Sequence, residues 1–162
     1  MSETLPKMDP KDINWSSLGF GYMPTNSYVR TTWQDGKWSE PVLIKEPTIT
    51  MSIAATCLHY GQAAFEGLKA FRQKDGKVRC LRPWENVKRM NLAADYMLAP
   101  AIPEELYIQM IQMVVKDNIE YVPPYGTGGA LYIRPLLIGT GAQVGVSPSK
   151  MYDFLILVTP VG

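Results

Sequence analysis

The sequence predicts one α+β domain in which two helices pack against a mainly antiparallel sheet. Two Asp-Gly dipeptides, at residues 35–36 and 75–76, each separate segments rich in β-branched and aromatic residues. Asp-Gly accepts the positive φ angles of a tight hairpin, and strands that a hairpin joins run antiparallel. Two stretches with apolar residues at helical spacing follow, and the chain of 162 residues has the length of one domain.

The expected strands come in three pairs along the chain. The first two pairs flank the Asp-Gly turns, and the third pair is joined by a longer loop at residues 140–150. Successive antiparallel pairs favour an antiparallel sheet over a doubly wound parallel one. The strands are predicted at residues 28–33 and 38–44, at 68–72 and 78–82, and at 130–138 and 152–159.

Two helices are expected between the second and third strand pairs. Pro83 suits the first position of one helix, and Pro103 suits the first turn of the other, where Glu104 and Glu105 complement the helix dipole. Arg89 lies off the apolar stripe of the first helix and is expected to face solvent or an interface. The predicted buried stripes are Val87, Met90, Ala94 and Met97 in the first helix, and Leu106, Met110, Met113 and Val114 in the second.

Composition argues against several classes of partner. Sixteen Lys and Arg residues oppose 15 Asp and Glu residues, so a net charge of +1 gives no long-range field to recruit nucleic acid or an anionic membrane. The longest purely apolar run, residues 154–158, is much shorter than a membrane span. Two cysteines, Cys57 and Cys80, are too few for a zinc site or a disulfide framework and indicate a reduced, cytoplasmic setting.

The N-terminal residues differ from the rest of the chain. Charged residues, Pro6 and Pro10 occur there without hydrophobic periodicity, and no apolar segment marks a secretory signal. We expect a flexible arm over residues 1–14 and the folded domain over residues 15–162.

The most informative strand is the first of the third pair. Side chains alternate between the faces of a strand, so Tyr132 and Arg134 share one face while Leu131 and Ile133 share the other. An arginine in an apolar strand requires an anionic partner, because an unpaired buried guanidinium costs much free energy. Tyr132 and Arg134 can therefore hold the carboxylate of a ligand. From the residues alone, a structural ion pair between Arg134 and an acidic residue at the sheet edge is favoured, because such pairs are common and Pro135 is typical of an edge or a bulge.

The glycine-rich segments and the single histidine indicate neither a nucleotide site nor a metal site. A phosphate-binding loop leads into a helix N-terminus, but residues 125–129 precede a strand, and residues 139–141 follow one without a helix behind them. Turns are the better interpretation of both segments. His59 has neither triad partners nor metal-ligand spacing around it, and we expect no metal site.

A set of motifs runs along the chain from about residue 15 to its end. The longest is LHYGQAAFEGLKAF at residues 58–71. The shorter ones are Phe20-Gly21, Arg82-Pro83 with Asn86, Arg89-Met90, LYIRP at residues 131–135, and Ile138-Gly139. In this order they resemble the N-terminal domain of branched-chain amino-acid aminotransferases, which are fold type IV enzymes that use pyridoxal 5'-phosphate. The long motif is highly specific, and Tyr-Ile-Arg-Pro supports it.

The resemblance implies the small lobe of a fold type IV enzyme. It also implies transfer of an amino group from leucine, isoleucine or valine to 2-oxoglutarate, with glutamate as product, through pyridoxal 5'-phosphate. Carried over by motif, Arg89 would bind the phosphate of the cofactor through a charge-assisted contact. Tyr132 would contact the substrate carboxylate. Arg134 would assist there, or would bind the side-chain carboxylate when glutamate occupies the site.

Four further residues would shape the substrate pocket if the resemblance holds. Tyr60 and Phe65 would wall its apolar side. Val144 and Val146 correspond to residues that the family contributes to the pocket of the neighbouring subunit, so the full-length enzyme would be a homodimer. Such a pocket must accept branched alkyl groups and also a carboxylate, which requires apolar walls beside a Tyr/Arg pair.

The chain lacks the lysine on which the family's chemistry depends. That Schiff-base lysine belongs to the C-terminal domain, beyond residues 159–162, and no lysine here matches its position. We therefore expect no catalytic residue in this chain, no firm hold on pyridoxal 5'-phosphate and no transamination by the chain alone. A D-amino-acid aminotransferase or an aminodeoxychorismate lyase of the same fold type is an alternative. A non-catalytic module that keeps a carboxylate site at Tyr132 and Arg134 is another.

Overall fold

An antiparallel sheet organises the protein. The computed structural model describes residues 5–162, and within them eight strands pair in one sheet. The strands are β1 (Tyr28–Gln34), β2 (Lys37–Trp38), β3 (Val42–Ile44), β4 (Ala63–Phe65), β5 (Leu68–Arg72), β6 (Val78–Cys80), β7 (Ala130–Gly139) and β8 (Met151–Val161). Their order is β2-β1-β8-β7-β5-β6, with β3 beside β1 and β4 beside β7. All of these pairs are antiparallel, which confirms the predicted sheet.

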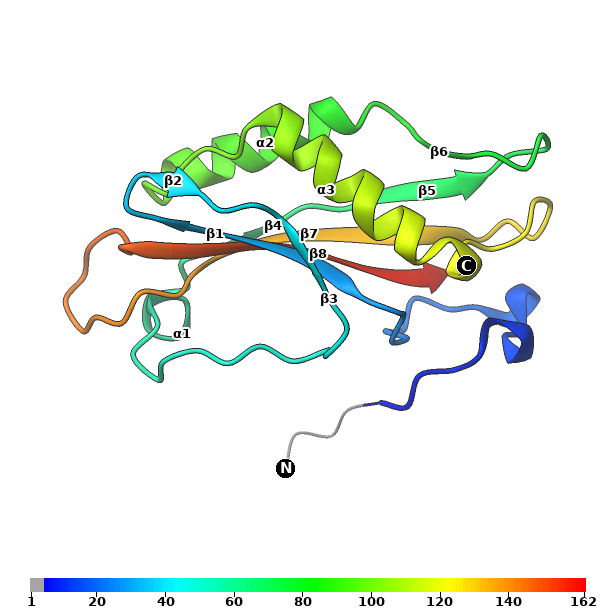
Figure 1. Ribbon diagram of the computed structural model, residues 1–162, viewed down its shortest axis with the longest axis horizontal. Helices are drawn as coiled ribbons and strands as arrows, with labels where there is room; N and C mark the ends of the chain where they lie inside the picture. The colour runs from blue at the N-terminus through cyan, green and yellow to red at the C-terminus, as the bar shows by residue number, and fades with distance from the viewer. Residues whose placement is uncertain (1–4) are drawn as a thin grey trace.

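Two long helices lie across one face of this sheet, and a shorter one lies on the opposite side (Figure 1). The long helices, α2 (Pro83–Tyr96) and α3 (Glu104–Asp117), confirm the predicted helices, and the short one is α1 (Thr56–Tyr60). Single 3-10 turns occur at Pro10–Asp12, Trp15–Ser17 and Ile119–Tyr121. Within residues 5–162, none of the helices has the length and apolarity needed to cross a membrane.

The first Asp-Gly turn has the predicted geometry. Asp35 and Gly36 have φ angles of 53° and 81°, and two successive positive φ angles define the type I′ turn that matches the twist of a hairpin. In the second hairpin only Gly76 has a positive φ, of 79°. Both hairpins form where they were predicted.

Three element boundaries differ from the predictions for backbone reasons. The expected strand at residues 38–44 is two strands, β2 and β3, because Pro41 lies between them and has no backbone N–H to donate. Arg82 has a φ of 42° and forms the N-cap of α2, so β6 ends at Cys80. Pro103 is the N-cap of α3 and precedes the helix. The sequence interpretation missed α1 and β4, which are too short to show periodicity.

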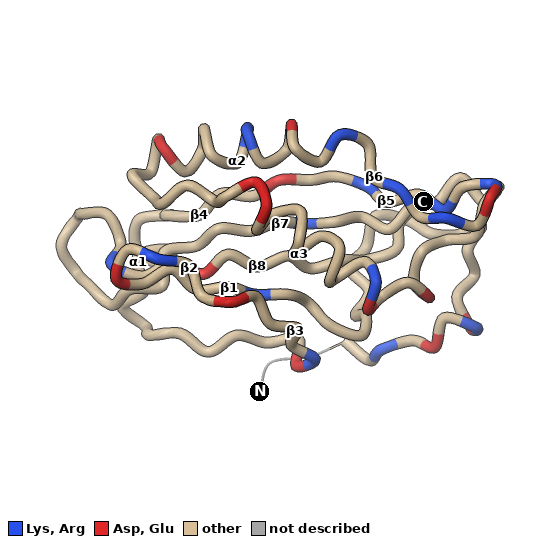
Figure 2. The backbone as a smooth tube through the Cα atoms, turned by 45° about the horizontal axis from the view of Figure 1, so that its top comes forward, with Lys and Arg blue, Asp and Glu red and all other residues tan. Residues whose placement is uncertain are grey.

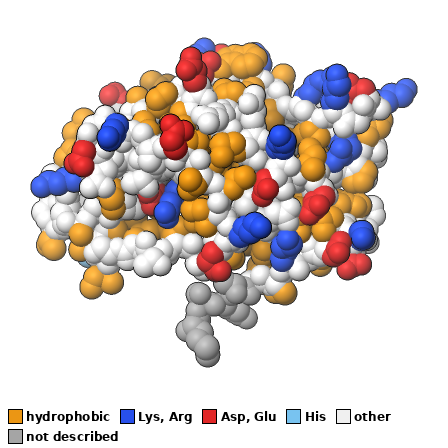
Figure 3. All heavy atoms as spheres, viewed as in Figure 1, with side chains coloured by type: hydrophobic (Ala, Val, Ile, Leu, Met, Phe, Trp, Pro, Cys, Tyr) orange, Lys and Arg blue, Asp and Glu red, His pale blue; other side chains and the backbone are white. Residues whose placement is uncertain are grey.

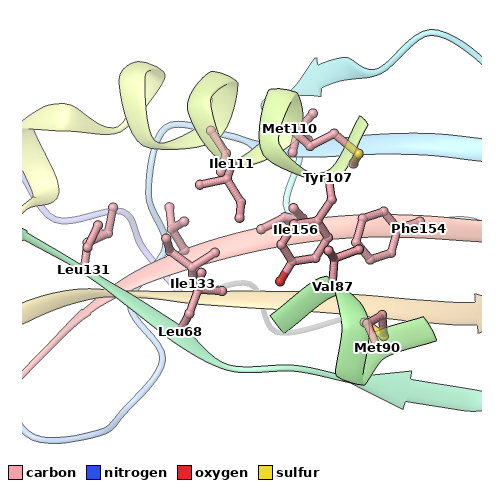
Figure 4. Packing of buried hydrophobic residues seen from close by; sticks show 14 of the residues in the cluster. Leu68, Val87, Met90, Tyr107, Met110, Ile111, Leu131, Ile133, Phe154 and Ile156 are labelled. Atoms are coloured by element: carbon pink, nitrogen blue, oxygen red, sulfur yellow. The ribbon is translucent and has the colours of Figure 1, made fainter. Parts of the chain in front are cut away.

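The hydrophobic core lies between the two long helices and the sheet (Figure 4). Alternate residues of β7 and β8 are buried against the helices, and the Tyr107 ring of α3 stacks on Phe154 with their centroids 5.9 Å apart. The predicted stripes face this core. Their fully buried residues are Val87, Met90, Ala94, Met110 and Val114, and their partly buried residues are Met97, Leu106 and Met113. The core residues of the strands include Leu131, Ile133, Leu137, Phe154, Ile156 and Val158.

Part of the predicted N-terminal arm contacts the domain. Ile13 is buried in the main core cluster, and the Tyr121 hydroxyl donates a hydrogen bond of 2.9 Å to the carbonyl oxygen of Met8. Residues 1–4 of the arm lie outside the described residues. The division of the chain at residue 14 stays a prediction.

Candidate anion-binding site

Tyr132 and Arg134 extend from β7 on the face of the sheet opposite α2 and α3. The Arg134 guanidinium donates from Nη2 to the Tyr132 hydroxyl at 3.1 Å, and its Cζ lies 4.4 Å from the centroid of the Phe65 ring. Phe65 reaches this position because β4 pairs with β7, which places it opposite Leu136. The Phe20 ring contacts the Tyr132 ring edge-on at 4.9 Å. The pair predicted from strand alternation is therefore held among aromatic rings.

Arg134 has no acidic partner among residues 5–162. Its Nε–H is buried and makes no hydrogen bond within these residues. Asp153 is the only acidic residue of β7 and β8, and it pairs instead with β1, where it accepts from Thr32 at 2.6 Å and approaches Arg30 at 4.0 Å. Figure 2 shows how few charged residues follow these two strands. A half-buried guanidinium with unused donors has the chemistry to bind an anion.

Glu66 and Gly67, which lie between β4 and β5, connect the Tyr132–Arg134 pair to α2. The Glu66 carboxylate accepts hydrogen bonds from Arg89 at 2.8 Å (Nε to Oε1) and 2.7 Å (Nη2 to Oε2). It also accepts from the Asn86 amide at 3.1 Å and from the Gly67 N–H at 3.2 Å. The Glu66 side chain is 9% exposed, whereas that of Arg89 is 65% exposed. Arg89 therefore faces solvent, as predicted, but one edge of its guanidinium is fixed.

Opposing effects set the pKa of Glu66. Burial is the largest of them and raises the pKa, because the carboxylate loses hydration. The hydrogen bonds from Arg89, Asn86 and the Gly67 N–H, with the positive charge of Arg89, together outweigh burial and hold the pKa below its usual value of 4.5. Glu66 is therefore ionised at neutral pH.

Gly67 permits a close approach of Tyr132. A Cβ atom at Gly67 would lie 2.3 Å from the Tyr132 hydroxyl oxygen and 3.0 Å from Cζ of the same ring. A side chain there would displace the hydroxyl and its hydrogen bond to Arg134. The tripeptide of Phe65, Glu66 and Gly67 thus contacts Arg134, Arg89 and Tyr132.

Arg89 retains the donors that a phosphate group requires. Glu66 occupies the side edge of its guanidinium, formed by Nε and Nη2, and Nη1 makes no hydrogen bond within residues 5–162. The end edge, formed by Nη1 and the second hydrogen of Nη2, is available for a bidentate contact with an oxyanion. The residues present fit one contact to the phosphate of pyridoxal 5'-phosphate.

The other three predicted pocket residues lie away from Arg134. Val144 and Val146 belong to the loop between β7 and β8, and Tyr60 contacts that loop. The Tyr60 hydroxyl donates to the carbonyl oxygen of Val144, and an isolated bridge pairs Ala55 with Ala142. Val144 and Val146 are 77% and 84% exposed. Figure 3 shows hydrophobic side chains reaching the surface at this end of the molecule. The contacts made by Tyr60 within residues 5–162 thus join it to this loop rather than to Phe65.

The sequence interpretation assigned no role to three residues that build the site. Glu66 and Asn86 hold Arg89, and Phe20 covers one edge of Tyr132. One signal for Glu66 was present, since a lone acid among the apolar residues at 63–71 needs a cationic partner. Contacts such as Phe20 with Tyr132 join distant parts of the chain and leave no local pattern.

Comparison with known proteins identifies relatives of the chain. No protein-family model matches it. It is 43% identical to a branched-chain-amino-acid aminotransferase of Haemophilus influenzae over 94% of its own length, and 40% identical to one of Helicobacter pylori over the same share. This chain is a homologue of branched-chain aminotransferases. The relatives are longer, because the chain covers 44% and 45% of them.

Solved structures of branched-chain aminotransferases share the fold. The enzyme of Escherichia coli superposes with a TM-score of 0.61 at 21% identity, over 82% of this chain and 40% of that one. The T.th. enzyme, solved with N-(5'-phosphopyridoxyl)-L-glutamate, gives a TM-score of 0.60 at 25% identity, over 80% and 40% of the two chains. The resemblance and the α+β fold predicted from the motifs are confirmed. The chain spans less than half of the length of each of these enzymes.

Proposed function

We propose that this chain forms the carboxylate-binding side of a branched-chain aminotransferase, which transfers the amino group of leucine, isoleucine or valine to 2-oxoglutarate. One observation carries the proposal: Arg134 lies among aromatic rings without an acidic partner in residues 5–162. The homology over 94% of the chain supports it. Because the chain spans less than half of the relatives it matches, the activity is proposed for this chain together with the remainder of such an enzyme.

The substrate contacts follow from the donors on β7. The Tyr132 hydroxyl accepts from Arg134 and so keeps its own hydrogen for a substrate carboxylate, next to the free donors of the guanidinium. The Phe65 ring gives the same place an apolar wall, suited to a branched alkyl side chain. When glutamate binds, Arg134 meets its side-chain carboxylate. One site thus serves both amino-acid classes.

Arg89 is the residue that would hold the cofactor, through the guanidinium edge that Glu66 leaves free. Pyridoxal 5'-phosphate, when bound, supplies the electron sink for the bond changes at the amino-acid Cα. No lysine of this chain is proposed to bond to the cofactor. One charged contact falls short of the ~4 kcal/mol that even millimolar binding needs. The 162-residue chain alone should therefore show no protein-bound visible absorption band after desalting with the cofactor.

A homodimer is the proposed assembly. Tyr60 bonds to the loop that carries Val144 and Val146. These three side chains are 38%, 77% and 84% exposed, and apolar side chains this accessible favour burial against a partner. A second copy would cover them and receive them in its own pocket. Replacing both Val144 and Val146 by serine should shift the sedimentation coefficient of the complete gene product toward that of a monomer. The free energy of unfolding should change by less than about 0.5 kcal/mol. Unchanged sedimentation would contradict the assembly.

Steady-state kinetics of the complete gene product that contains this chain tests the function. Leucine and 2-oxoglutarate should be converted, and Arg134→Ala should raise the KM for glutamate about 10- to 100-fold, because a charge-assisted hydrogen bond is lost. Arg79→Ala is the matched control, since this exposed arginine pairs with Asp75 in the β5–β6 hairpin. Preference for D-alanine over leucine would favour the D-amino-acid aminotransferase. A protein that binds leucine without converting it would favour the non-catalytic module.

A further inference from the structure

Glu66 is an unusually well-fixed acid beside an exposed arginine. Ordinary surface ion pairs join two mobile side chains and contribute little to stability. Here the carboxylate is 9% exposed and is held by the Asn86 amide and the Gly67 N–H as well as by Arg89. The backbone N–H of Glu66 donates to the carbonyl oxygen of Pro135 on β7, which fixes its main chain. The anchored carboxylate therefore dictates where the guanidinium lies.

The geometry of the pair selects one edge of the Arg89 guanidinium. Both hydrogen bonds to Glu66 use the Nε–Nη2 edge, which a carboxylate bridges side-on. The Nη1–Nη2 edge then points away from Glu66. Without Glu66, a long arginine on an exposed helix face would sample many rotamers.

We infer that Glu66, supported by Asn86, is a positioning residue that fixes the Arg89 guanidinium with its end edge presented to the phosphate group of the cofactor. The inference rests on the proposed function, because it takes Arg89 as the phosphate contact. Asn86 joins the arrangement through a single amide nitrogen, which donates to Glu66 at 3.1 Å and to the carbonyl oxygen of Gly67 at 3.3 Å. Neither residue touches the phosphate itself.

Electrostatics alone predicts the opposite effect, which makes the inference testable. A negative charge next to a phosphate-binding arginine weakens the attraction for phosphate, so removing Glu66 would tighten binding if charge were all that mattered. Positioning predicts weaker binding, because the ligand must then order a mobile side chain. The expected loss is about three- to tenfold in affinity.

Binding of pyridoxamine 5'-phosphate to the complete gene product that contains this chain, followed by the ³¹P chemical shift of the ligand, measures the effect directly. Pyridoxamine without the phosphate, followed by proton NMR, reports contacts that do not involve Arg89. Glu66→Gln should weaken binding of the phosphorylated compound alone, and Glu66→Asp should do the same while keeping the charge. The Nε–H signal of Arg89, visible when protected by Glu66, should be lost in both. Glu85→Gln is the control, since Glu85 pairs with exposed Lys88 on the same helix.

A double-mutant cycle distinguishes failure of this inference from failure of the proposed function. If Glu66 acts through Arg89, Glu66→Gln adds no further loss to Arg89→Ala. Unchanged or tighter phosphate binding in both Glu66 variants would overturn the positioning role while leaving Arg89 as the contact. If Arg89→Ala itself binds as the wild type does, the proposed phosphate contact fails as well. Asn86→Ala leaves Glu66 in place and should show a smaller loss of the same sign, so the inference is tested even if the Glu66 variants do not fold.

Discussion

The two faces of strand β7 serve different purposes. On the helix-covered face, Leu131, Ile133 and Leu137 have no exposed surface. On the opposite face, Tyr132 and Arg134 are half-buried and keep hydrogen-bonding capacity unused within residues 5–162. The side-chain alternation of one strand thus separates the hydrophobic core from the proposed binding site by a single residue step. A register slip of one residue would exchange the two roles and destroy both.

The largest expected effect on stability contrasts two phenylalanines, Phe154 and Phe65, which lie on opposite faces of the sheet. Phe154 is fully buried between the Tyr107 and Trp38 rings, whose centroids lie 5.9 and 6.4 Å from its own. Phe154→Ala should lower the free energy of unfolding by about 3–5 kcal/mol, because it leaves a cavity in the core. Phe65→Ala should change it by less than about 0.5 kcal/mol, since that ring is 64% exposed. Urea unfolding measures both, and equal losses would break the contrast between the faces.

A smaller effect is expected at Gly67, which lies against the Tyr132 ring on the face opposite the long helices. Gly67→Ala places a Cβ 2.3 Å from the Tyr132 hydroxyl oxygen, and the forced displacement should cost about 1–3 kcal/mol. Adding Tyr132→Phe removes the clashing oxygen and should recover part of that loss. Gly145→Ala is the matched control, because a Cβ there meets nothing within 4 Å. If the double variant is no more stable than Gly67→Ala, the clash is not with the hydroxyl.

The smallest of the three effects is the pH dependence that Glu66 confers. Its pKa in the folded chain lies below the usual value of 4.5, so the folded state binds its proton less readily than the unfolded state does. The stabilisation is then fully present above pH 4.5 and is lost as the pH falls through the lower folded pKa. Glu66→Gln should cost about 1 kcal/mol at neutral pH and converge with the wild type in acid.

Urea unfolding between pH 3 and 7 checks this convergence. Glu85→Gln provides the comparison for an exposed acid, since Glu85 pairs with Lys88 in solvent. A Glu66→Gln difference that stays constant down to acid pH would mean that the carboxylate charge does not contribute.

The fold was predictable where local chemistry decides the backbone. The Asp-Gly turns, the two helices and the strands β7 and β8 follow from residue patterns that act within a few positions. The short elements were not predictable in this way. The β4 strand exists because it pairs with β7, and β3 returns to β1 after the break at Pro41, so both depend on partners distant in sequence.

The Tyr132–Arg134 pair of the candidate site was more predictable than the contact between Glu66 and Arg89. Strand alternation was enough to place Tyr132 beside Arg134, but it could not decide whether an acid from elsewhere pairs with the arginine. That question depended on Asp153, which β1 engages through Arg30 and Thr32. The fixing of Arg89 by Glu66 could not be predicted, because it requires the β4–β5 connection and α2 to meet in space.

Strand β8 lies between β1 and β7 in the sheet, although it follows both in the chain. On the ribosome, β1 therefore emerges long before the neighbour that completes its hydrogen bonding, and it waits with an open edge while most of the chain is made. Formation of the sheet is then delayed until β8 leaves the exit tunnel. A nascent chain arrested before Met151 should be held by chaperones and cleaved readily by proteases, and resistance should arise only once β8 is outside the ribosome.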